Sequence, residues 1–272
     1  MRPLRGAEGE ITEPWPRAAQ VSFFVAADAY DRFMGRYSTR LAPRFADLAG
    51  LERGQRALDV GCGPGALTGE LVARLGAEAV AAVDPSEQFV TAARERHPGV
   101  DVRRAAAEEL PFPDAEFDVA LAQLVVHFMA DPVGGLREMA RVTRSGGVVV
   151  ACVWDLAGGR APISMFWTAA RRLDPGARDE SALAGARRGH LNELFEAAGL
   201  HDVAETELAV RVEFASFDEW WEPFTLGVGP AGAYAAGLDA DRREELKQRC
   251  RHLAPDAPFT LESIAWAARG HA

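Results

Sequence analysis

The sequence has few cysteines and lacks a long apolar run. Its three cysteines, Cys62, Cys152 and Cys250, are too far apart for a metal cluster, and an odd number cannot all pair internally. We expect reduced thiols in a cytoplasmic protein. No stretch of about 18 uninterrupted apolar residues is present, and residues 1–10 lack the apolar core of a signal peptide. No transmembrane helix is therefore expected.

Basic residues are scarce relative to acidic ones. The chain has 30 Lys and Arg against 40 Asp and Glu, which gives a formal net charge of -10. An acidic protein repels phosphate backbones, so a nucleic-acid partner is disfavoured. The length of 272 residues suits one large α/β domain with insertions better than two compact domains.

The most informative feature that is present is a glycine-rich turn. In LDVGCGPG (residues 58–65) a short apolar strand runs into three alternating glycines, and an amphipathic helix begins at Ala66. Glycines let a ligand lie against bare main chain, and the helix points its amide donors and positive dipole end at that ligand. The pattern is typical of a nucleotide-binding turn, although several cofactors use such turns.

Two acidic residues narrow the choice of nucleotide. Asp59 lies two residues before the first glycine, and Asp84 ends a second apolar strand about twenty residues beyond the turn, the spacing expected of a ribose-binding acid. Asp84 could instead cap the next helix, with Pro85 at N1 and Glu87 at N3. A nicotinamide-dependent oxidoreductase would also fit the glycines and Asp84, but it leaves LPFPDAEFD (residues 110–118) unexplained.

The segments around these acids resemble the class I S-adenosylmethionine-dependent methyltransferases, in particular their UbiE-like or type 11 branch. The matching segments are LDVGCGPG (58–65), AAVDPS (81–86), AEELPFPDAEFDVA (107–120) and LREMARVTRSGGVVV (136–150). The resemblance covers residues 57 to about 153, in the order and at the spacing of the family. It implies S-adenosyl-L-methionine as cofactor and S-adenosyl-L-homocysteine as product.

The resemblance also implies which residues hold the cofactor. The expected contacts are Asp59, Gly61, Gly63 and Gly65 for the methionyl part, Asp84 with its neighbours Pro85 and Ser86 for the ribose, and Ala107 and Glu108 for the adenine. The family often has an Asp where this chain has Ala106. Adenine recognition is therefore expected to rest on main-chain groups, with somewhat weaker affinity.

A helical segment before the turn supplies further candidates. Apolar residues recur every three or four positions from Ala26 to Leu48, and Gly35 and Pro43 are expected to divide this segment into two or three short helices. The resemblance places the segment over the cofactor, although the stripe also fits plain packing. The candidates for cofactor contact here are Tyr30, Arg36 and Tyr37.

Gln123 and His127 follow the fourth strand, beside the expected methyl group. Gln123 is predicted to line the cofactor pocket, and His127 is either a general base or a packed structural histidine. This segment offers no acidic ligands for a metal-dependent O-methyltransferase, so no metal is expected. The chain has no Pro-Pro pair, which amino-methyltransferases acting on bases use at this point.

Strands and helices alternate along the chain, which predicts a doubly wound, Rossmann-like α/β fold. We expect a seven-stranded, mostly parallel sheet with an antiparallel edge hairpin and helical cover insertions. The predicted strands are 56–60, 79–83, 100–103, 118–122, 147–153, 203–214 and 259–268, and the predicted helices include 86–96, 133–143 and 189–198. The ligand is expected at the carboxyl ends of the first and fourth strands, where the strand order reverses.

The chain is expected to form a single methyltransferase domain over residues 26–272 after a flexible N-terminus at 1–25. Its parts are a helical cap at 26–50, a cofactor-binding core at 51–153 and a C-terminal half at 154–272, with substrate covers at 155–188 and 215–256. The covers are expected to roof an apolar acceptor cavity that opens onto Gln123, His127 and Trp154.

An aromatic stripe lies within the second cover. Phe217, Trp220, Trp221 and Phe224 recur at helical spacing, which fits core packing, but adjacent tryptophans point about 100° apart and one of them could line a pocket. The expected function is methyl transfer to a small, largely apolar molecule by a monomer or homodimer without a nucleic-acid or membrane partner. A cofactor-binding protein without catalytic activity stays an alternative.

Overall fold

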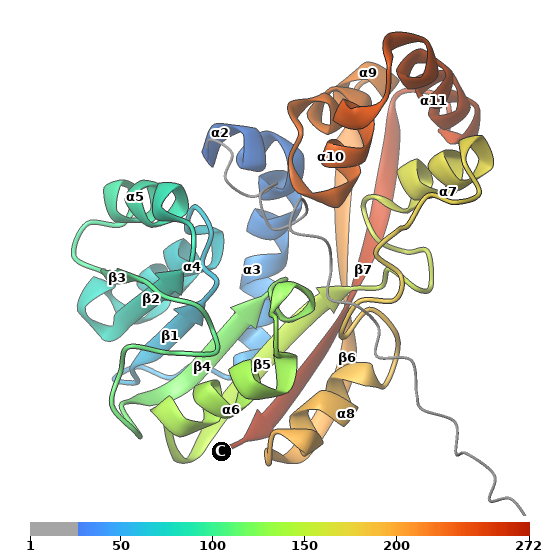
Figure 1. The fold of residues 1–272 in the computed structure, drawn as a ribbon. Helices are drawn as coiled ribbons and strands as arrows, with labels where there is room; N and C mark the ends of the chain where they lie inside the picture. Colours follow the sequence, from blue (N-terminus) through green and yellow to red (C-terminus); the bar gives the residue numbers. More distant parts are fainter. Residues whose placement is uncertain (1–26) are drawn as a thin grey trace, which may run out of the picture.

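The computed structural model describes residues 27–272, so the predicted flexible N-terminus lies outside the described residues (Figure 1). One sheet has the strand order β3-β2-β1-β4-β5-β7-β6. Strands β1 to β5 are parallel, and β7 runs antiparallel to both β5 and β6. The strands are β1 (Ala57–Val60), β2 (Val80–Asp84), β3 (Asp101–Arg104), β4 (Phe117–Gln123), β5 (Thr143–Trp154), β6 (His201–Phe214) and β7 (Phe259–His271). The predicted seven-stranded sheet with its antiparallel edge hairpin is confirmed.

Helices cover both faces of this sheet (Figure 1). The helices of the cofactor-binding half are α4 (Ala66–Leu75), η2 (Ala77–Ala79), α5 (Glu87–Arg96), η3 (Val126–Phe128) and α6 (Pro132–Val142). One buried cluster includes Leu71 of α4 and Leu121 of β4, while a second includes Leu136 of α6 and Ala120 of β4. Successive residues of β4 are therefore buried on opposite faces, which explains why the central strands are continuously apolar.

The segment before β1 forms one continuous helical stretch. It consists of α2 (Ala27–Tyr30), the π-helical turn η1 (Asp31–Gly35) and α3 (Arg36–Ala49). The predicted break at Pro43 is wrong, because α3 continues through it. Proline inside a helix costs about 3 kcal/mol, but fully buried side chains such as Leu41 and Phe45 each contribute about 1.5–3 kcal/mol. Packing against the sheet therefore outweighs the local preference.

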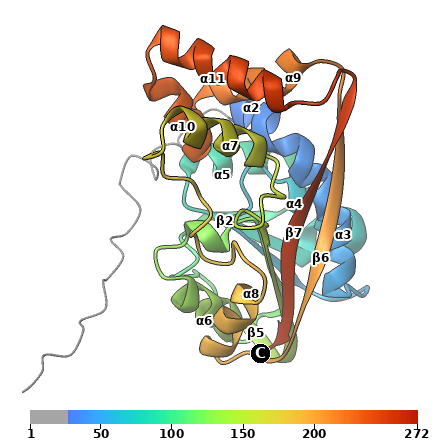
Figure 2. The same ribbon diagram turned by 90° about the vertical axis from the view of Figure 1, so that its right-hand side faces the viewer.

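Strands β6 and β7 extend beyond the sheet and carry the helical covers. β5 pairs with residues 265–271 of β7, whereas residues 259–264 of β7 pair with β6 alone. Several cover helices gather around this projecting end of the hairpin (Figure 2). The C-terminal helices are α7 (Ser164–Leu173), α8 (His190–Ala197), α9 (Phe217–Trp221), η4 (Glu222–Leu226), α10 (Gly229–Gly237) and α11 (Ala240–Leu253). Within residues 27–272 no helix has the length and apolarity needed to cross a bilayer.

Candidate functional site

The glycine turn joins β1 to α4 and is tied to the neighbouring strand. The amides of Gly61 and Cys62 donate to the Val83 carbonyl oxygen at 2.8 and 2.9 Å. Gly61 has a φ of +70°, and a Cβ on it would lie 2.5 Å from a methyl group of Val125. Backbone conformation and lack of space therefore both require glycine here.

The other two glycines differ in what surrounds them. A Cβ on Gly63 would meet only the ring of Tyr30, at 4.0 Å, whereas one on Gly65 would lie 2.6 Å from the ring of His97. The Gly65 carbonyl oxygen is also 2.8 Å from Nε2 of His97. Gly63 is thus buried but has free space where a Cβ would stand, with Tyr30 beyond it, while Gly65 makes room for a histidine. Nothing in the spacing of the sequence indicated that role for His97.

Asp84 reaches back from the end of β2 to the glycine turn. Its Oδ2 accepts a hydrogen bond from the Gly63 amide at 2.9 Å, and its Oδ1 accepts one from the Ser86 amide at 2.8 Å. Ser86, not Asp84, is the N-cap of α5, because its side chain accepts from the Phe89 amide. The capping alternative for Asp84 is therefore wrong. Each carboxylate oxygen keeps a lone pair for a further donor.

Asp59 is the second buried carboxylate at the turn. Its Oδ2 accepts a hydrogen bond from Oγ1 of Thr68 at 2.7 Å, and its Oδ1 has no partner among the described residues. Burial raises the pKa of Asp59 to about 7 and that of Asp84 to about 6. A buried acceptor without a donor is costly, so this oxygen indicates a place for a donor group of a ligand.

More buried polar atoms without a partner lie near the same edge of the sheet. Within the described part of the chain they include Ser38 Oγ, Gln123 Oε1, His127 Nδ1 and Trp154 Nε1. Gln123 ends β4 and Trp154 ends β5, and Nε2 of Gln123 donates to the Ser38 carbonyl oxygen at 3.3 Å. Buried polar atoms are normally hydrogen-bonded, so this edge would gain most from a polar ligand.

The residues predicted to contact the adenine, and Pro85 at the predicted ribose site, make contacts within the protein. The carboxylate of Glu108 accepts from the amides of Ala130 and Asp131 at 2.7 and 3.2 Å, which fixes the loop leading into α6. Ala107 is buried in the second core cluster, and the Pro85 carbonyl oxygen accepts from Nε of Arg104 at 3.1 Å. The cofactor contacts expected of these residues stay predictions.

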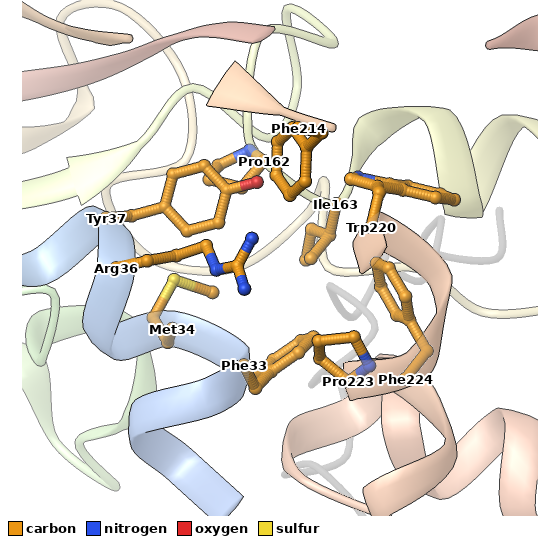
Figure 3. Close-up of a pocket in the computed structure, with 10 residues that line it drawn as sticks. All are labelled: Phe33, Met34, Arg36, Tyr37, Pro162, Ile163, Phe214, Trp220, Pro223 and Phe224. Atoms are coloured by element: carbon orange, nitrogen blue, oxygen red, sulfur yellow. The ribbon is translucent and has the colours of Figure 1, made fainter. Parts of the chain in front are cut away.

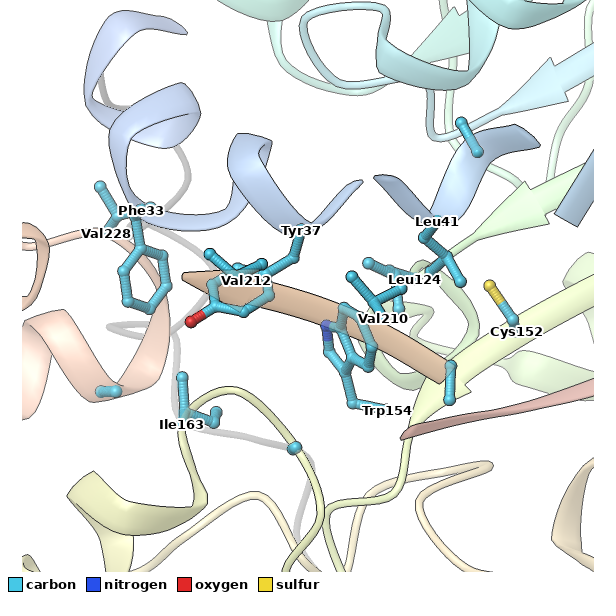
Figure 4. Close-up of a cluster of buried hydrophobic side chains, with 14 of the residues drawn as sticks. Phe33, Tyr37, Leu41, Leu124, Cys152, Trp154, Ile163, Val210, Val212 and Val228 are labelled. Carbon is cyan, nitrogen blue, oxygen red and sulfur yellow. The ribbon is translucent and has the colours of Figure 1, made fainter. Parts of the chain in front are cut away.

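Of the three cap residues predicted to contact the cofactor, Tyr30 lies at the glycine turn, whereas Arg36 and Tyr37 lie at the C-terminal covers and β5. Tyr30 stands over Gly63 and packs edge-on against Phe89, with ring centroids 5.2 Å apart. Arg36 pairs with Glu219 at 3.2 Å, and Tyr37 packs edge-on against Trp154 at 6.2 Å. Figure 4 shows Tyr37 and Trp154 side by side in the buried cluster next to β6. Tyr30 is thus the candidate with contacts at the glycine turn.

His127 is a buried neutral ring. Burial lowers its pKa to about 3, and its ring centroid lies 3.9 Å from that of Phe128. A histidine with such a pKa is uncharged at neutral pH and is a weak base. Its role as a general base stays a prediction. Among residues 27–272, no group of three or more His, Cys, Asp or Glu side chains is arranged to hold a metal ion.

An aromatic pocket lies between the helical cap and the covers (Figure 3). The empty space in it and at its mouth, open solvent included, is about 250 Å³. The lining residues are Phe33, Met34, Arg36, Tyr37, Pro162, Ile163, Phe214, Trp220, Pro223 and Phe224. Both predicted covers contribute to the lining, but the expected opening onto Gln123, His127 and Trp154 is wrong, because these residues do not line this pocket. Trp154 packs against Tyr37 instead.

The two adjacent tryptophans of α9 have different surroundings. Trp220 lines the pocket and packs against Phe224, with ring centroids 4.8 Å apart. Trp221 stacks on Phe166 and Phe217 at 6.3 and 6.4 Å. The whole stripe is buried in the first hydrophobic cluster, so its interpretation as core packing is confirmed. That Trp220 lines a substrate pocket stays a prediction.

Comparison with known proteins identifies the central part of the chain. Residues 58–151 match a family described as "Methyltransferase domain". The 27-O-demethylrifamycin SV methyltransferase of Amycolatopsis mediterranei (strain S699) is 33% identical over 162 residues, which are 50% of this chain and 58% of that protein. The demethylmenaquinone methyltransferase of Mycobacterium sp. (strain KMS) is 40% identical over 119 residues, 43% of this chain and 49% of that protein. The chain thus spans about half the length of these curated relatives.

A solved structure extends the likeness to most of the fold. The YcgJ protein from Bacillus subtilis superposes with a TM-score of 0.56 at 20% sequence identity, covering 85% of this chain and 97% of that protein. At this identity the similarity concerns the fold. The matched family and the two relatives are methyltransferases, which leaves the nicotinamide-dependent interpretation of the glycine turn without support.

Proposed function

We propose that this chain, which contains a class I S-adenosylmethionine-dependent methyltransferase domain, transfers a methyl group from S-adenosylmethionine to a small, largely apolar molecule. The observation that carries the proposal is the pair of buried carboxylates, Asp59 and Asp84, beside Gly63, where free space stands in place of a side chain. Carboxylates suit a cofactor that presents an ammonium group and two ribose hydroxyls, because all of these donate hydrogen bonds.

Each carboxylate suits a different part of the cofactor. The free lone pairs of Asp84 would accept the ribose hydroxyls, since its existing bonds to Gly63 and Ser86 fix the orientation of the carboxylate. The unpartnered Oδ1 of Asp59 would accept a hydrogen bond from the methionyl ammonium group. Tyr30 would cover the turn and limit the access of water. When bound, S-adenosylmethionine supplies an electrophilic methyl group on a sulfonium centre.

The pocket suits the second substrate. Apart from Arg36, its lining side chains are apolar or aromatic, as is usual for small-molecule sites. Methyl transfer is an in-line displacement that depends mainly on alignment and on the exclusion of water. Tyr37, Trp220 and the other enclosing residues would supply both. The two curated relatives are named for small molecules, which agrees with this assignment.

Ligand-induced stabilisation tests the cofactor, and label incorporation tests the reaction. We expect S-adenosylhomocysteine at a concentration well above its Kd to raise the melting temperature, and NADH to leave it unchanged. Incubation with methyl-labelled S-adenosylmethionine and fractionated small-molecule extracts should then label an apolar fraction. Stabilisation by NADH alone would contradict the proposal. Binding of S-adenosylhomocysteine with no labelled product in any extract would favour a binding protein without catalytic activity.

A further inference from the structure

The aromatic pocket contains one charged side chain, that of Arg36. Methyl transfer to an apolar molecule does not by itself explain why a cation lies there. The guanidinium of Arg36 points from α3 into the middle of the lining, near the hydroxyl of Tyr37 (Figure 3). The Arg36 side chain is 25% exposed, and its guanidinium carbon lies 5.0 Å from the centre of the Phe214 ring. A partly desolvated cation among aromatic rings gains strongly from an anionic partner.

The guanidinium has donors left for such a partner. Among residues 27–272 its hydrogen-bonded partner is Glu219, which accepts from Nη1 at 3.2 Å. Arginine carries five N–H donors and no acceptor, so Nε and Nη2 can still donate. Of the other lining side chains, those of Tyr37 and Trp220 carry a hydrogen-bonding group, and neither is charged. Arg36 is therefore the charged group of this lining.

Glu219 is held in place independently of Arg36. Its amide donates to Oγ of Ser216 at 3.1 Å, and its Oε2 accepts from the Ala215 amide at 2.8 Å. These bonds leave Oε1 to hold the guanidinium from one side. Removing Glu219 would therefore free Arg36, whereas removing Arg36 would leave the pocket without its cation.

We propose that the methyl acceptor is an aromatic molecule that carries an anionic oxygen, a carboxylate or a phenolate, and that Arg36 binds this oxygen. The inference rests on the proposed function and names the substrate class of the same site. It replaces the cofactor contact that the sequence predicted for Arg36, because the side chain reaches Glu219 and Phe214. Aromatic rings of the ligand would pack against Phe33, Trp220 and Phe224.

Binding of matched probes to the full chain tests this inference without any methyl transfer. The probes are 2-naphthoate as the carboxylate, 2,4-dinitrophenolate as the phenolate and 2-naphthol as the neutral analogue, measured by calorimetry at pH 7.5. We expect at least one of the two anions to bind about tenfold or more tightly than 2-naphthol, because hydrogen bonds between charged groups are the stronger ones. The anion that binds more tightly shows whether the pocket prefers a carboxylate or a phenolate.

Three variants separate anion binding from a purely structural ion pair. Arg36→Gln should abolish the preference for the anion, whereas Glu219→Gln should keep or increase it, because the guanidinium stays and its competitor is lost. Arg32→Gln is the matched control: Arg32 lies one helical turn earlier, pairs with Glu222 at 2.6 Å and is 53% exposed. It should leave probe binding unchanged.

The outcomes distinguish this inference from the proposed function. Equal binding of anions and 2-naphthol, binding of none of the probes, or loss of the preference in Glu219→Gln as well as in Arg36→Gln would overturn the inference. Loss of S-adenosylhomocysteine affinity in Arg36→Gln would also overturn it and return Arg36 to the cofactor. Failure of the wild-type chain to bind S-adenosylhomocysteine would count against the proposed function instead.

Discussion

The glycine turn is held by hydrogen bonds to the neighbouring strand, whereas the aromatic pocket is formed by side chains that lie far apart in the sequence. Gly61 bonds to Val83 and Gly63 bonds to Asp84, about one strand–helix unit away in sequence. The ion pair at the pocket, Arg36–Glu219, joins residues 183 positions apart. One region is built mostly from main chain, and the other mostly from side chains.

This difference predicts how well each region tolerates amino-acid substitutions. Main-chain donors and a required glycine leave little freedom at the turn, so the turn suits a ligand that is always the same. The pocket depends on rings and ion pairs that substitutions can alter without disturbing the sheet. We expect substitutions at the turn to affect cofactor binding most, and substitutions at the pocket to affect the acceptor.

Replacing Asp84 should give the largest effect. Asp84→Ala removes the acceptor proposed for the ribose hydroxyls and leaves the Gly63 amide without its partner. Hydrogen bonds to a charged group contribute about 1.5–3 kcal/mol each, so affinity for S-adenosylhomocysteine should fall at least about tenfold. Calorimetry measures this, with the exposed Asp256→Ala as a control of equal charge change. A destabilised Asp84→Ala protein with unchanged affinity would limit Asp84 to a structural role.

The pH dependence of cofactor binding should be set by the ionisation of Asp84 and Asp59. Burial raises the pKa of Asp84 to about 6 and that of Asp59 to about 7, and the ionised forms are the ones that accept hydrogen bonds. Affinity should therefore fall as the pH is lowered below about 7, by roughly tenfold at pH 5 from Asp84 alone.

The stability of the free protein should change in the opposite direction. A carboxyl whose pKa is raised by folding keeps its proton in the folded state at a pH where the unfolded chain has lost it. Between pH 4 and 7 these two acids therefore contribute less stability as the pH rises. Comparison of the wild type with Asp84→Asn in urea titrations isolates the contribution of Asp84, and an identical pH dependence in both proteins would contradict the assignment.

Substitutions of the two tryptophans of α9 test the pocket, and we expect a smaller change in affinity from them. Trp220→Phe should weaken 2-naphthoate binding about fivefold, because it removes part of the apolar lining at a cost of roughly 1 kcal/mol. Trp221→Phe is the matched control, since Trp221 packs against Phe166 and Phe217. It should lower the melting temperature and leave probe affinity unchanged. Equal loss of affinity in both variants would mean that the stripe acts only as core.

The sequence predicted the sheet and the turn well because their signals are local. Short apolar strands carry Asp59 next to the end of β1 and Asp84 at the end of β2, and the alternation of polar and apolar residues in 203–214 indicates the edge hairpin. Each of these patterns is contained within one element, so no knowledge of distant residues is needed.

The pocket and several helix details could not be predicted in the same way. Whether Trp220 or Trp221 faces the pocket depends on how α9 packs on Phe166 and on the cap, which is a long-range contact. The helix through Pro43 persists because buried side chains on α3 outweigh a local penalty. His97 beside Gly65 is likewise visible only after folding, because no spacing rule connects the two residues.

Replacing His127 should give the smallest effect, and it separates the two regions most clearly. A general base usually contributes about 10²–10⁴-fold to the rate. Because His127 is buried with a pKa of about 3, we expect His127→Asn to change kcat less than about threefold with the acceptor found by labelling. The pH–rate profile of the wild type should likewise show no histidine step between pH 5 and 8. If His127→Asn lost more than about a hundredfold in kcat while its melting temperature and S-adenosylhomocysteine affinity stayed unchanged, His127 would be the base. Retained activity would instead agree with an acceptor that reaches the pocket already ionised, as the position of Arg36 implies.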